Sequence, residues 1–502
     1  MRANLDRRVV GALAVVALLA IVVYISTPFS FWVADDFNYL TPKGLDRVLG
    51  FFDPTVSWRA FYRPLVWSSW ALDYAVWGTS PFGWHITSIA LNVVTTVVIA
   101  LIVWRLLGRW GVAILTAALF ALHPAHTEAV AWINGRTDEG CGFFYFPAVL
   151  FFVIFLQRRA ANRPSTLLYV LALVFAVCVL LSKETGVTLP LIFLLTDLVF
   201  FTGIVALREA RAWRGLLLTH LPFFALAAVY VVLRLGLLAT GVVTNVFPGL
   251  TISRPQAVLD AQSNNILLLS GLWTGPGLPT EWSNLAKVTV VLAAIAVGVL
   301  AVWWLGKVAV YGLLWTAITL IPTYNLVAVR YLYTPSFGIC LIVGFALWKF
   351  SIQATEGKSR ALRTARYAIV ALVMFAWGLG ALSFNLDWYR AGEEARSVLS
   401  QIQASVPDPG KPTTIYFAGA PSTYGKVLLF NTGLPSGMSY VFPGGSVELH
   451  EVDVAQPDDV IKDAMSSPPK IKPNPLFLGY LGGKVEKFQT IEALISSVTW
   501  KH

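Results

Sequence analysis

Two adjacent carboxylates, Asp35 and Asp36, are the residues of this sequence whose types and spacing best suit chemistry. They follow an apolar segment at about 9–25, which is long enough to cross a bilayer. Charged groups at the edge of a membrane are costly unless water, a cation or a reaction makes use of them. The pair therefore indicates either acid–base chemistry or a solvated helix cap or turn.

A second set of polar residues, on the side opposite the basic loops, falls in a few short segments between apolar runs. They alternate guanidinium, imidazole and carboxylate groups, a mixture that can bind an anion or a sugar. These segments are Phe61-Tyr62-Arg63-Pro64-Leu65, Pro81-Phe82-Gly83-Trp84-His85, His123-Pro124-Ala125-His126-Thr127-Glu128, Trp132-Ile133-Asn134-Gly135-Arg136-Thr137-Asp138, Ser182-Lys183-Glu184-Thr185-Gly186 and Arg330-Tyr331-Leu332-Tyr333.

The composition requires a membrane to position these segments. The chain has 502 residues, of which 57% are hydrophobic and 13% charged, and its mean hydropathy is +0.68. These values exclude a soluble domain and a disordered chain, and they predict an α-helical polytopic membrane protein. The three cysteines lie far apart, so neither a disulfide framework nor a metal knuckle is indicated.

Segments of about 20 apolar residues predict eleven membrane-spanning helices. The first follows Arg7 and Arg8 and lacks a small-residue cleavage signature, so we expect a retained signal anchor. The predicted spans lie near 9–25, 85–104, 111–122, 141–156, 166–181, 187–206, 215–235, 286–305, 308–323, 333–349 and 367–386.

Alternate loops between these spans are rich in Arg and Lys, and the opposite loops carry mixed charge. The positive-inside rule makes the basic set cytoplasmic. The net charge of +10 is then explained by topology, and nucleic-acid binding is not needed. We expect a multi-pass protein of the bacterial inner membrane, with a cytoplasmic N-terminus and an extracytoplasmic C-terminal domain.

The composition changes near Asp387 and divides the chain into two predicted domains. Residues 1–386 form the transmembrane domain, whose outer loop 26–84 carries the acidic pair and aromatic interfacial helices. Residues 387–502 form a small α/β domain. We further expect a short helix at Ile266–Leu272, a helix at Trp388–Val406, strands at Thr414–Ala418, Lys426–Phe430 and Met438–Phe442, and a closing helix or strand at Ile491–Val498.

The order of the polar segments, from the acidic pair to Arg330-Tyr331-Leu332-Tyr333, resembles that of a known family. The chain is similar to the GT-C glycosyltransferases, and among them to bacterial relatives of the transmembrane and tetratricopeptide-repeat-containing O-mannosyltransferases. The resemblance covers about residues 30–345, and the run from His123 to Asp138 carries most of its specificity. An α/β tail stands in place of the repeats of the animal members.

The resemblance implies a sugar donor on a polyprenyl phosphate and transfer, with inversion, to a hydroxyl of a protein, glycan or lipid. The acidic pair then supplies the catalytic residues, with Asp35 preferred over Asp36 as general base. Cationic and polar side chains bind the phosphate and the sugar. No cofactor is implied, and a divalent metal is possible without being favoured. The implied donor-binding residues are Arg63, His85, His123, His126, Glu128, Arg136, Asp138, Lys183, Glu184, Arg330, Tyr331 and Tyr333.

Structural explanations of the same residues stay open. The segment at 123–126, with Glu128, suits helix-end capping or a phosphate contact, and its His-x-x-His spacing also suits a metal, although no thiolate supports zinc. Lys183 and Glu184 are also consistent with an exposed pair of neighbours. Arg330 could extend to lipid head groups.

Tyr331 and Tyr333 are also typical of the aromatic belt at a membrane surface. For the whole chain, the rival function is that of a lipid or glycan transporter or flippase. Transport usually needs ionisable groups at mid-membrane, where these spans carry almost none. An inactive scaffold is a third possibility, against which the acidic pair and the cationic residues argue together.

Overall fold

The structure is a computed structural model, and it describes residues 7–40, 48–53, 61–203, 208–239, 254–271, 282–353, 360–425, 427–452, 472 and 474–499. The chain forms two compact units. The first contains Met1–Ile25, Gly44–Ala75 and Trp84–Asn385, and the second contains Ser26–Lys43, Val76–Gly83 and Leu386–His502. The acidic pair therefore belongs to the same unit as the C-terminal region.

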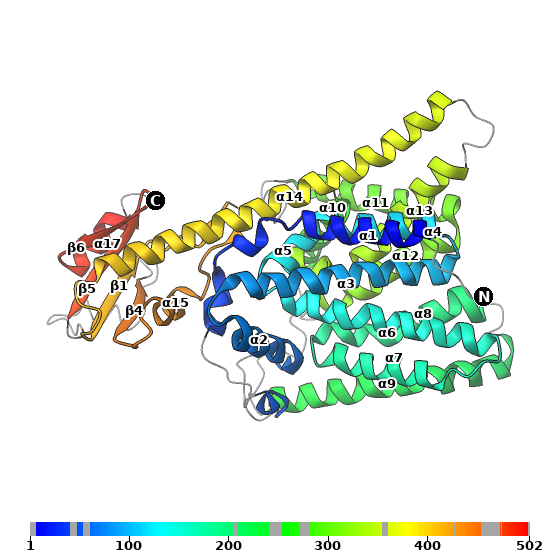
Figure 1. Cartoon of the computed structure of the whole chain (residues 1–502), viewed down its shortest axis with the longest axis horizontal. Coiled ribbons are helices and arrows are strands. Elements are labelled where there is room, and N and C mark those ends of the chain that lie inside the picture. The colour runs from blue at the N-terminus through cyan, green and yellow to red at the C-terminus, as the bar shows by residue number, and fades with distance from the viewer. Residues whose placement is uncertain are drawn as a thin grey trace. The chain divides into compact units, whose positions relative to one another are not determined.

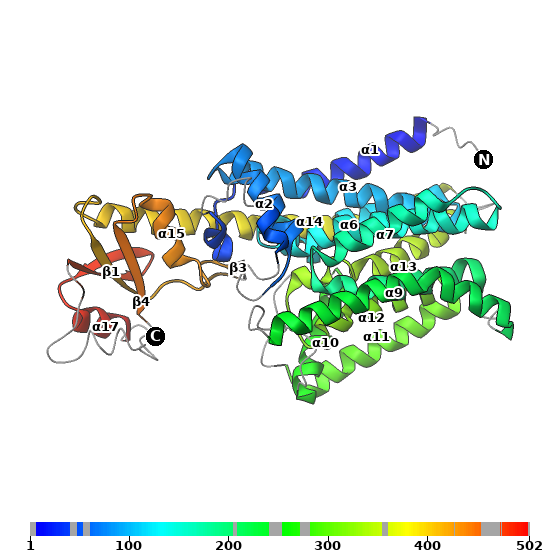
Figure 2. The same ribbon diagram turned by 90° about the horizontal axis from the view of Figure 1, so that it is seen from below.

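Helices account for most of the described chain, and α3, α6, α7 and α9 run roughly along a common axis in Figures 1 and 2. The α-helices before the C-terminal region are α1 (Arg7–Val22), α2 (Pro64–Trp77), α3 (Pro81–Leu107), α4 (Trp110–Ala121), α5 (Thr127–Ala131), α6 (Arg136–Ala160), α7 (Thr166–Leu180), α8 (Leu189–Asp197), α9 (Ala210–Ala239), α10 (Pro255–Leu269), α11 (Asn284–Leu305), α12 (Lys307–Leu320), α13 (Ser336–Trp348) and α14 (Arg360–Ser405).

Short 3-10 and π helices connect these elements. They are η1 (Thr27–Phe29), η2 (Ala34–Tyr39), η4 (Leu49–Phe52), η5 (Pro124–His126), η6 (Glu184–Thr188), η7 (Leu198–Thr202), η10 (Ile321–Thr323), η11 (Val329–Leu332) and η12 (Lys349–Gln353).

The fold class is confirmed, and each of the eleven predicted spans coincides with an apolar helix of the described residues. Seven of these helices are long and apolar enough to cross a membrane. The other four, Trp110–Ala121, Thr166–Leu180, Lys307–Thr323 and Ser336–Ser351, have only 10–17 residues. The helix positions therefore agree with the sequence, whereas the exact number of spans is not established.

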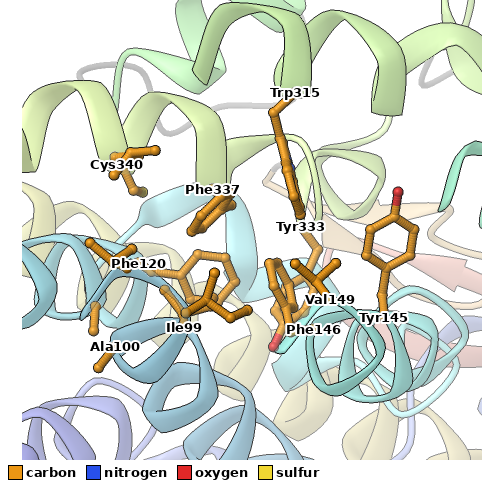
Figure 3. Packing of buried hydrophobic residues seen from close by; sticks show 14 of the residues in the cluster. Ile99, Ala100, Phe120, Tyr145, Phe146, Val149, Trp315, Tyr333, Phe337 and Cys340 are labelled. Atoms are coloured by element: carbon orange, nitrogen blue, oxygen red, sulfur yellow. The ribbon is translucent and has the colours of Figure 1, made fainter. Parts of the chain in front are cut away.

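The first unit is held together by a core of interlocking aromatic and aliphatic side chains, part of which Figure 3 shows. Phe146 of α6 stacks on Trp315 of α12 with ring centroids 5.9 Å apart. Because lipid is as apolar as these side chains, close packing rather than escape from water favours helix association. Gly312 and Gly338 allow α12 and α13 to approach, since a Cβ on Gly338 would lie 2.1 Å from the Gly312 carbonyl oxygen.

The second unit contains a four-stranded sheet of order β4-β1-β5-β6. β1 pairs in parallel with both β4 and β5, and β6 is antiparallel to β5. Helix α17 packs on this sheet and shares a small hydrophobic core with it. The elements are β1 (Thr413–Ala418), β2 (Thr423–Tyr424), β3 (Val427–Leu428), α15 (Leu434–Val441), β4 (Val447–Val452), β5 (Pro475–Leu481), β6 (Lys484–Phe488) and α17 (Ile491–Thr499).

Several local predictions for this region need correction. The strand predicted at Met438–Phe442 is wrong, because these residues overlap helix α15, which has a proline in its first turn that favours helix initiation. The helix predicted at Trp388–Val406 is the end of the continuous 46-residue helix α14, so the change in composition at Asp387 breaks no helix.

Two further predictions concern short elements. The strand predicted at Lys426–Phe430 is reduced to β3, which pairs with β2 outside the main sheet, and Lys426 itself lies outside the described residues. The short helix predicted at Ile266–Leu272 is the end of α10. The flanking positions 240–253 and 272–281 lie outside the described residues.

Candidate functional site

An ion-pair network in the first unit brings together six of the predicted donor-binding residues. Arg63 binds Glu184 through two nitrogens, with Nε–Oε2 at 3.1 Å and Nη2–Oε1 at 2.6 Å. Lys183 Nζ lies 2.5 Å from Asp138 Oδ2, and Arg330 Nε lies 3.8 Å from the same oxygen. Arg330 also binds Glu128 through Nη1 and through its backbone N–H, the latter at 3.1 Å from Oε2.

Local structure explains how these residues meet. Arg63 directly precedes the N-terminus of α2, Asp138 lies in the first turn of α6, and Lys183 and Glu184 lie at the start of η6. Two glycines permit the tight turns involved. A Cβ on Gly135 would lie 2.2 Å from the Glu128 carbonyl oxygen, and one on Gly186 would lie 2.4 Å from a Val179 side-chain carbon.

Aromatic rings cover the cations of the network. Lys183 Nζ lies 4.7 Å from the ring centre of Tyr331, and the Arg330 guanidinium lies 4.8 Å from the same ring. Arg330 also lies 5.1 Å from the Trp132 ring. Tyr331 is therefore a contact of the network, which supports its predicted place at the site more than a place in an aromatic belt.

The two arginines of the network stay charged although they are largely buried. Burial alone would lower the pKa of Arg63, but the carboxylates of Glu184 and Asp138 outweigh burial and raise that pKa. The pKa of Arg330 is raised in the same way, with Glu128 as the main opposing charge. The Lys183 side chain is 2% exposed, so the alternative of an exposed Lys-Glu pair is wrong.

Arg234, on α9, is a candidate site residue that the sequence analysis did not include. It is fully buried and interacts electrostatically with Glu184. With Arg63, Lys183 and Arg330 it makes four cations against the carboxylates of Glu128, Asp138 and Glu184, which leaves one net positive charge. A charged residue inside an apolar helix was the signal that could have found it.

A small polar cavity adjoins the network. Asp138 and Tyr331 line it together with Cys141 and Tyr145, and its volume is about 10 Å³. Such a volume accommodates about one water molecule. Hydroxyl groups complete the wall, from Thr185, Thr188, Thr319 and Thr334.

Arg136 lies in a separate cluster with α2 and α3. Its Nη1 lies 2.5 Å from Asp73 Oδ2, its Nη2 donates to the Trp84 carbonyl oxygen at 2.6 Å, and its Nε donates to Ser88 Oγ at 3.2 Å. The side chain is 1% exposed. All three guanidinium nitrogens are thus used internally, and this geometry favours a structural role over the predicted contact with a donor. The predicted His85 is also buried, on α3 beside Trp84.

His123 and His126 are buried and face protein groups. His123 Nδ1 accepts from the Ala125 N–H at 3.1 Å, and Nε2 donates to the Leu269 carbonyl oxygen at 3.2 Å. Burial lowers the pKa of His123 to about 4. His126 Nε2 lies 2.7 Å from Ser336 Oγ. For His123 this arrangement corresponds to the capping alternative, because both ring nitrogens already have partners.

Tyr333 is fully buried, and its hydroxyl donates to Asn92 Oδ1 at 2.9 Å. The aromatic-belt alternative is therefore wrong for Tyr333. Its hydrogen bond links the residue that follows η11 to Asn92 on α3. Among the residues that the structure describes, no group of three or more His, Cys, Asp or Glu side chains is arranged to hold a metal ion.

The two carboxylates of the acidic pair have different surroundings in the second unit. Asp36 is 1% exposed, and its Oδ2 accepts from the Val33 N–H at 3.2 Å, so it caps its own turn. Asp35 is partly exposed, and its Oδ1 accepts hydrogen bonds from Asn431 Nδ2 and Thr432 Oγ1, both at 2.8 Å. Asp35 is therefore the carboxylate that a second molecule can reach.

Comparisons with known proteins agree with the resemblance drawn from the sequence motifs. No protein-family model matches the chain. The protein O-mannosyl-transferase Tmtc1 of Drosophila melanogaster is 26% identical over 521 residues, covering 80% of this chain and 59% of that protein. The mouse protein O-mannosyl-transferase TMTC1 is 35% identical over 143 residues, covering 27% of this chain and 15% of that protein. The chain thus spans less than two thirds of these relatives.

A solved structure has a similar fold. The archaeal oligosaccharyltransferase AglB from Archaeoglobus fulgidus, in complex with an inhibitory peptide and a dolichol-phosphate, matches with a TM-score of 0.50 and 13% sequence identity. The match covers 82% of this chain and 63% of that one. The predicted resemblance is confirmed: this chain is a multi-pass membrane protein similar in sequence to the protein O-mannosyltransferases, with a fold of the GT-C glycosyltransferase type.

Proposed function

We propose that this protein transfers a sugar from a polyprenyl-phosphate donor to an acceptor hydroxyl, with inversion at the anomeric carbon. The observation that carries the proposal is the ion-pair network of Arg63, Glu184, Lys183, Asp138, Arg330 and Glu128. Buried ion pairs contribute little net stability, because desolvation offsets their attraction. Stability therefore does not account for a buried network of six ionisable side chains, and a role in binding or catalysis explains it better.

The charge of the network suits a glycosyl phosphodiester. With Arg234 included, the four cations and three carboxylates leave one positive charge, and a phosphodiester carries one negative charge. As the bond to the sugar breaks, the leaving phosphate gains a second negative charge. Arg330 is the cation best placed to respond, because its side chain is 22% exposed, whereas that of Lys183 is 2% exposed.

Asp35 is the proposed general base. Its carboxylate takes the proton of the acceptor hydroxyl while the hydroxyl oxygen forms a bond to the anomeric carbon. The bond from that carbon to the phosphate oxygen breaks at the same time, and the polyprenyl phosphate leaves with the electron pair. Asp35 suits this role better than Asp36, which is buried and engaged with backbone.

The relatives guide the choice of substrates. Because the fly and mouse relatives are named protein O-mannosyl-transferases, we propose a polyprenyl-phosphate mannose as the first donor to test and a protein hydroxyl as the first acceptor. The archaeal enzyme of similar fold was captured with dolichol-phosphate, which is consistent with a polyprenyl carrier here. The remaining predicted contacts, His85, His123, His126, Arg136 and Tyr333, are proposed to shape and support the site.

We further propose that the protein lies in a bacterial inner membrane, with a transmembrane catalytic domain at 1–386 and an extracytoplasmic α/β domain at 387–502. The N-terminus would be cytoplasmic. A reporter fused after His502 tests this orientation. Activity of a phosphatase reporter there is expected, and activity of a cytoplasmic fluorescent reporter in its place would overturn the topology.

The decisive experiment uses purified full-length protein in nanodiscs with a panel of polyprenyl-phosphate sugars. Consumption of one donor with transfer to a serine- or threonine-containing peptide is expected. Asp35→Asn should abolish transfer while retaining donor binding, and Asp36→Asn serves as the neighbouring control for charge and folding. Full activity of Asp35→Asn would remove Asp35 from the mechanism, and consumption of no donor would overturn the proposed reaction.

A further inference from the structure

The segment that carries Asp35 packs against a loop of the C-terminal region within the second unit. We call this loop, residues 429–433, the Asp35 loop; it follows β3 and leads into α15, which Figure 1 draws in orange. The Ala34 N–H donates to the Leu429 carbonyl oxygen at 2.6 Å. Residues almost 400 positions apart in the sequence are therefore joined at the backbone next to Asp35.

The two backbones fit closely at this point. Ala34 has φ 51°, a left-handed conformation that is strained for a residue other than glycine. Such a conformation persists where its surroundings enforce it. On the opposite side, a Cβ on Gly433 would lie 1.8 Å from the Ala34 carbonyl oxygen, so glycine is required there. The Asp35 loop therefore fixes the backbone that leads into Asp35.

Side chains of the loop bind the Asp35 carboxylate directly. Asn431 Nδ2 and Thr432 Oγ1 both donate to Oδ1 at 2.8 Å. Thr432 Oγ1 in turn accepts from Asn38 Nδ2 at 3.2 Å, which leaves its own proton for Asp35. Both donors thus act on one oxygen. Among the described residues, none donates a hydrogen bond to Oδ2, so this oxygen keeps its capacity to accept a proton.

Aromatic packing supports the same contact. Phe37, two residues after Asp35, stacks on Phe430 of the Asp35 loop with ring centroids 6.2 Å apart. Phe31, on the other side, meets Tyr440 of α15 edge to face at 5.6 Å. The segment around Asp35 is thus held from both sides by the C-terminal region. A partly exposed carboxylate with this much support is better explained by a requirement for orientation than by solvation.

We propose that Asn431 and Thr432 are positioning residues that orient the Asp35 carboxylate, so that the catalytic base depends on the C-terminal α/β domain for its geometry. This inference rests on the proposed role of Asp35 as general base. By holding Oδ1, the two residues present Oδ2 to the acceptor hydroxyl. A displacement of about 1 Å at a reacting group can lower the rate about 100-fold, so hydrogen bonds that hold the Asp35 carboxylate in place would protect the rate of transfer.

The test compares three variants of the full-length protein. Thr432→Val combined with Asn431→Ala removes both donors to Asp35. Thr432→Ser keeps the hydroxyl and is the conservative variant. Ser436→Ala is the matched control, because Ser436 Oγ donates to Asn38 Oδ1 at 2.5 Å and makes no contact with Asp35 among the described residues. Each variant is assayed for kcat, for KM of the donor and for melting temperature.

We expect the double variant to lower kcat by about 100-fold with KM of the donor changed by less than about threefold. Thr432→Ser should stay within about threefold of wild-type kcat, as should Ser436→Ala. The inference fails if the double variant retains wild-type kcat. It fails equally if Ser436→Ala loses as much activity as the double variant, because that outcome would indicate a general structural effect.

The outcome for Asp35→Asn separates this inference from the function on which it depends. Full activity of Asp35→Asn would refute the proposed base, and the positioning role with it. An inactive Asp35→Asn together with a fully active double variant would leave the base in place and refute only the positioning role.

Discussion

Replacing Arg330 by glutamine removes the most exposed cation of the ion-pair network. The substitution breaks the side-chain bond to Glu128, the weaker contact with Asp138 at 3.8 Å, and the stacking on Tyr331 and Trp132. One bond survives, because the backbone N–H of residue 330 still donates to Glu128 Oε2. The local fold of η11 should therefore remain.

The expected magnitudes follow from burial. Removing one partner of a fully buried ion pair costs about 3–5 kcal/mol, because it leaves an uncompensated charge. The Arg330 side chain is 22% exposed and Glu128 keeps its backbone donor, so we expect about 2–3 kcal/mol of lost stability. If Arg330 stabilises the leaving phosphate, kcat should fall by about 100- to 1000-fold, or about 2.7–4 kcal/mol in the transition state.

The assay measures kcat, KM and melting temperature of purified protein in nanodiscs, with polyprenyl-phosphate mannose as first donor. The informative comparison is the double variant Glu128→Gln/Arg330→Gln, which replaces the ion pair by two neutral amides. Because neither charge is then left without a partner, much of the lost stability should return. The activity should stay low, since no cation has been restored.

This reasoning would be refuted if the double variant regained activity to within about threefold of wild type. Arg330 would then serve to neutralise Glu128 and not the phosphate. Arg330→Lys provides a further control, because it keeps the charge but not the planar group that can bind two oxygens at once, and it should recover only part of the activity.

The remaining predictions address the other parts of the molecule. Arg136→Gln should lower the melting temperature strongly, because it leaves the buried Asp73 without its cation; unchanged melting with lost transfer would instead indicate a donor contact. In the folded protein the pKa of His123 is lowered to about 4, whereas in the unfolded protein it is about 6.5. Between these two pH values the unfolded protein binds a proton at His123 and the folded protein does not, so stability should fall as pH drops from about 6.5 to about 4. His123→Gln should flatten that part of a plot of melting temperature against pH, and an unchanged slope would contradict the assignment. Gly433→Ala should cost about 1–3 kcal/mol and reduce kcat, because its Cβ would displace the Ala34 carbonyl; wild-type kinetics and melting would show that the loop tolerates the shift. EDTA should leave transfer unchanged, whereas a loss that a divalent ion reverses would favour a metal.

The sequence by itself determined where the helices lie and which residues could form a site. Hydropathy placed the seven long and four shorter apolar helices found among the described residues, because a bilayer demands apolar segments regardless of their neighbours. The short elements of the C-terminal region were harder. Met438–Phe442 has a strand-like composition, but the adjoining proline and the packing of α15 made it helical. In a run of five residues, the strand preference of the individual amino acids is weaker than the packing of the surrounding structure.

Tertiary structure decided which polar residues act together. Arg63 and Glu184 are 121 positions apart, Arg330 and Glu128 are 202, and Asp35 and Asn431 are 396. No spacing rule connects such positions, because an ion pair depends on where the folded chain brings two side chains. For the same reason the sequence could not show that Arg136 pairs with Asp73 or that Arg234 interacts with Glu184. The sequence thus determined the residue types available to the candidate site, and only the fold assigned their partners.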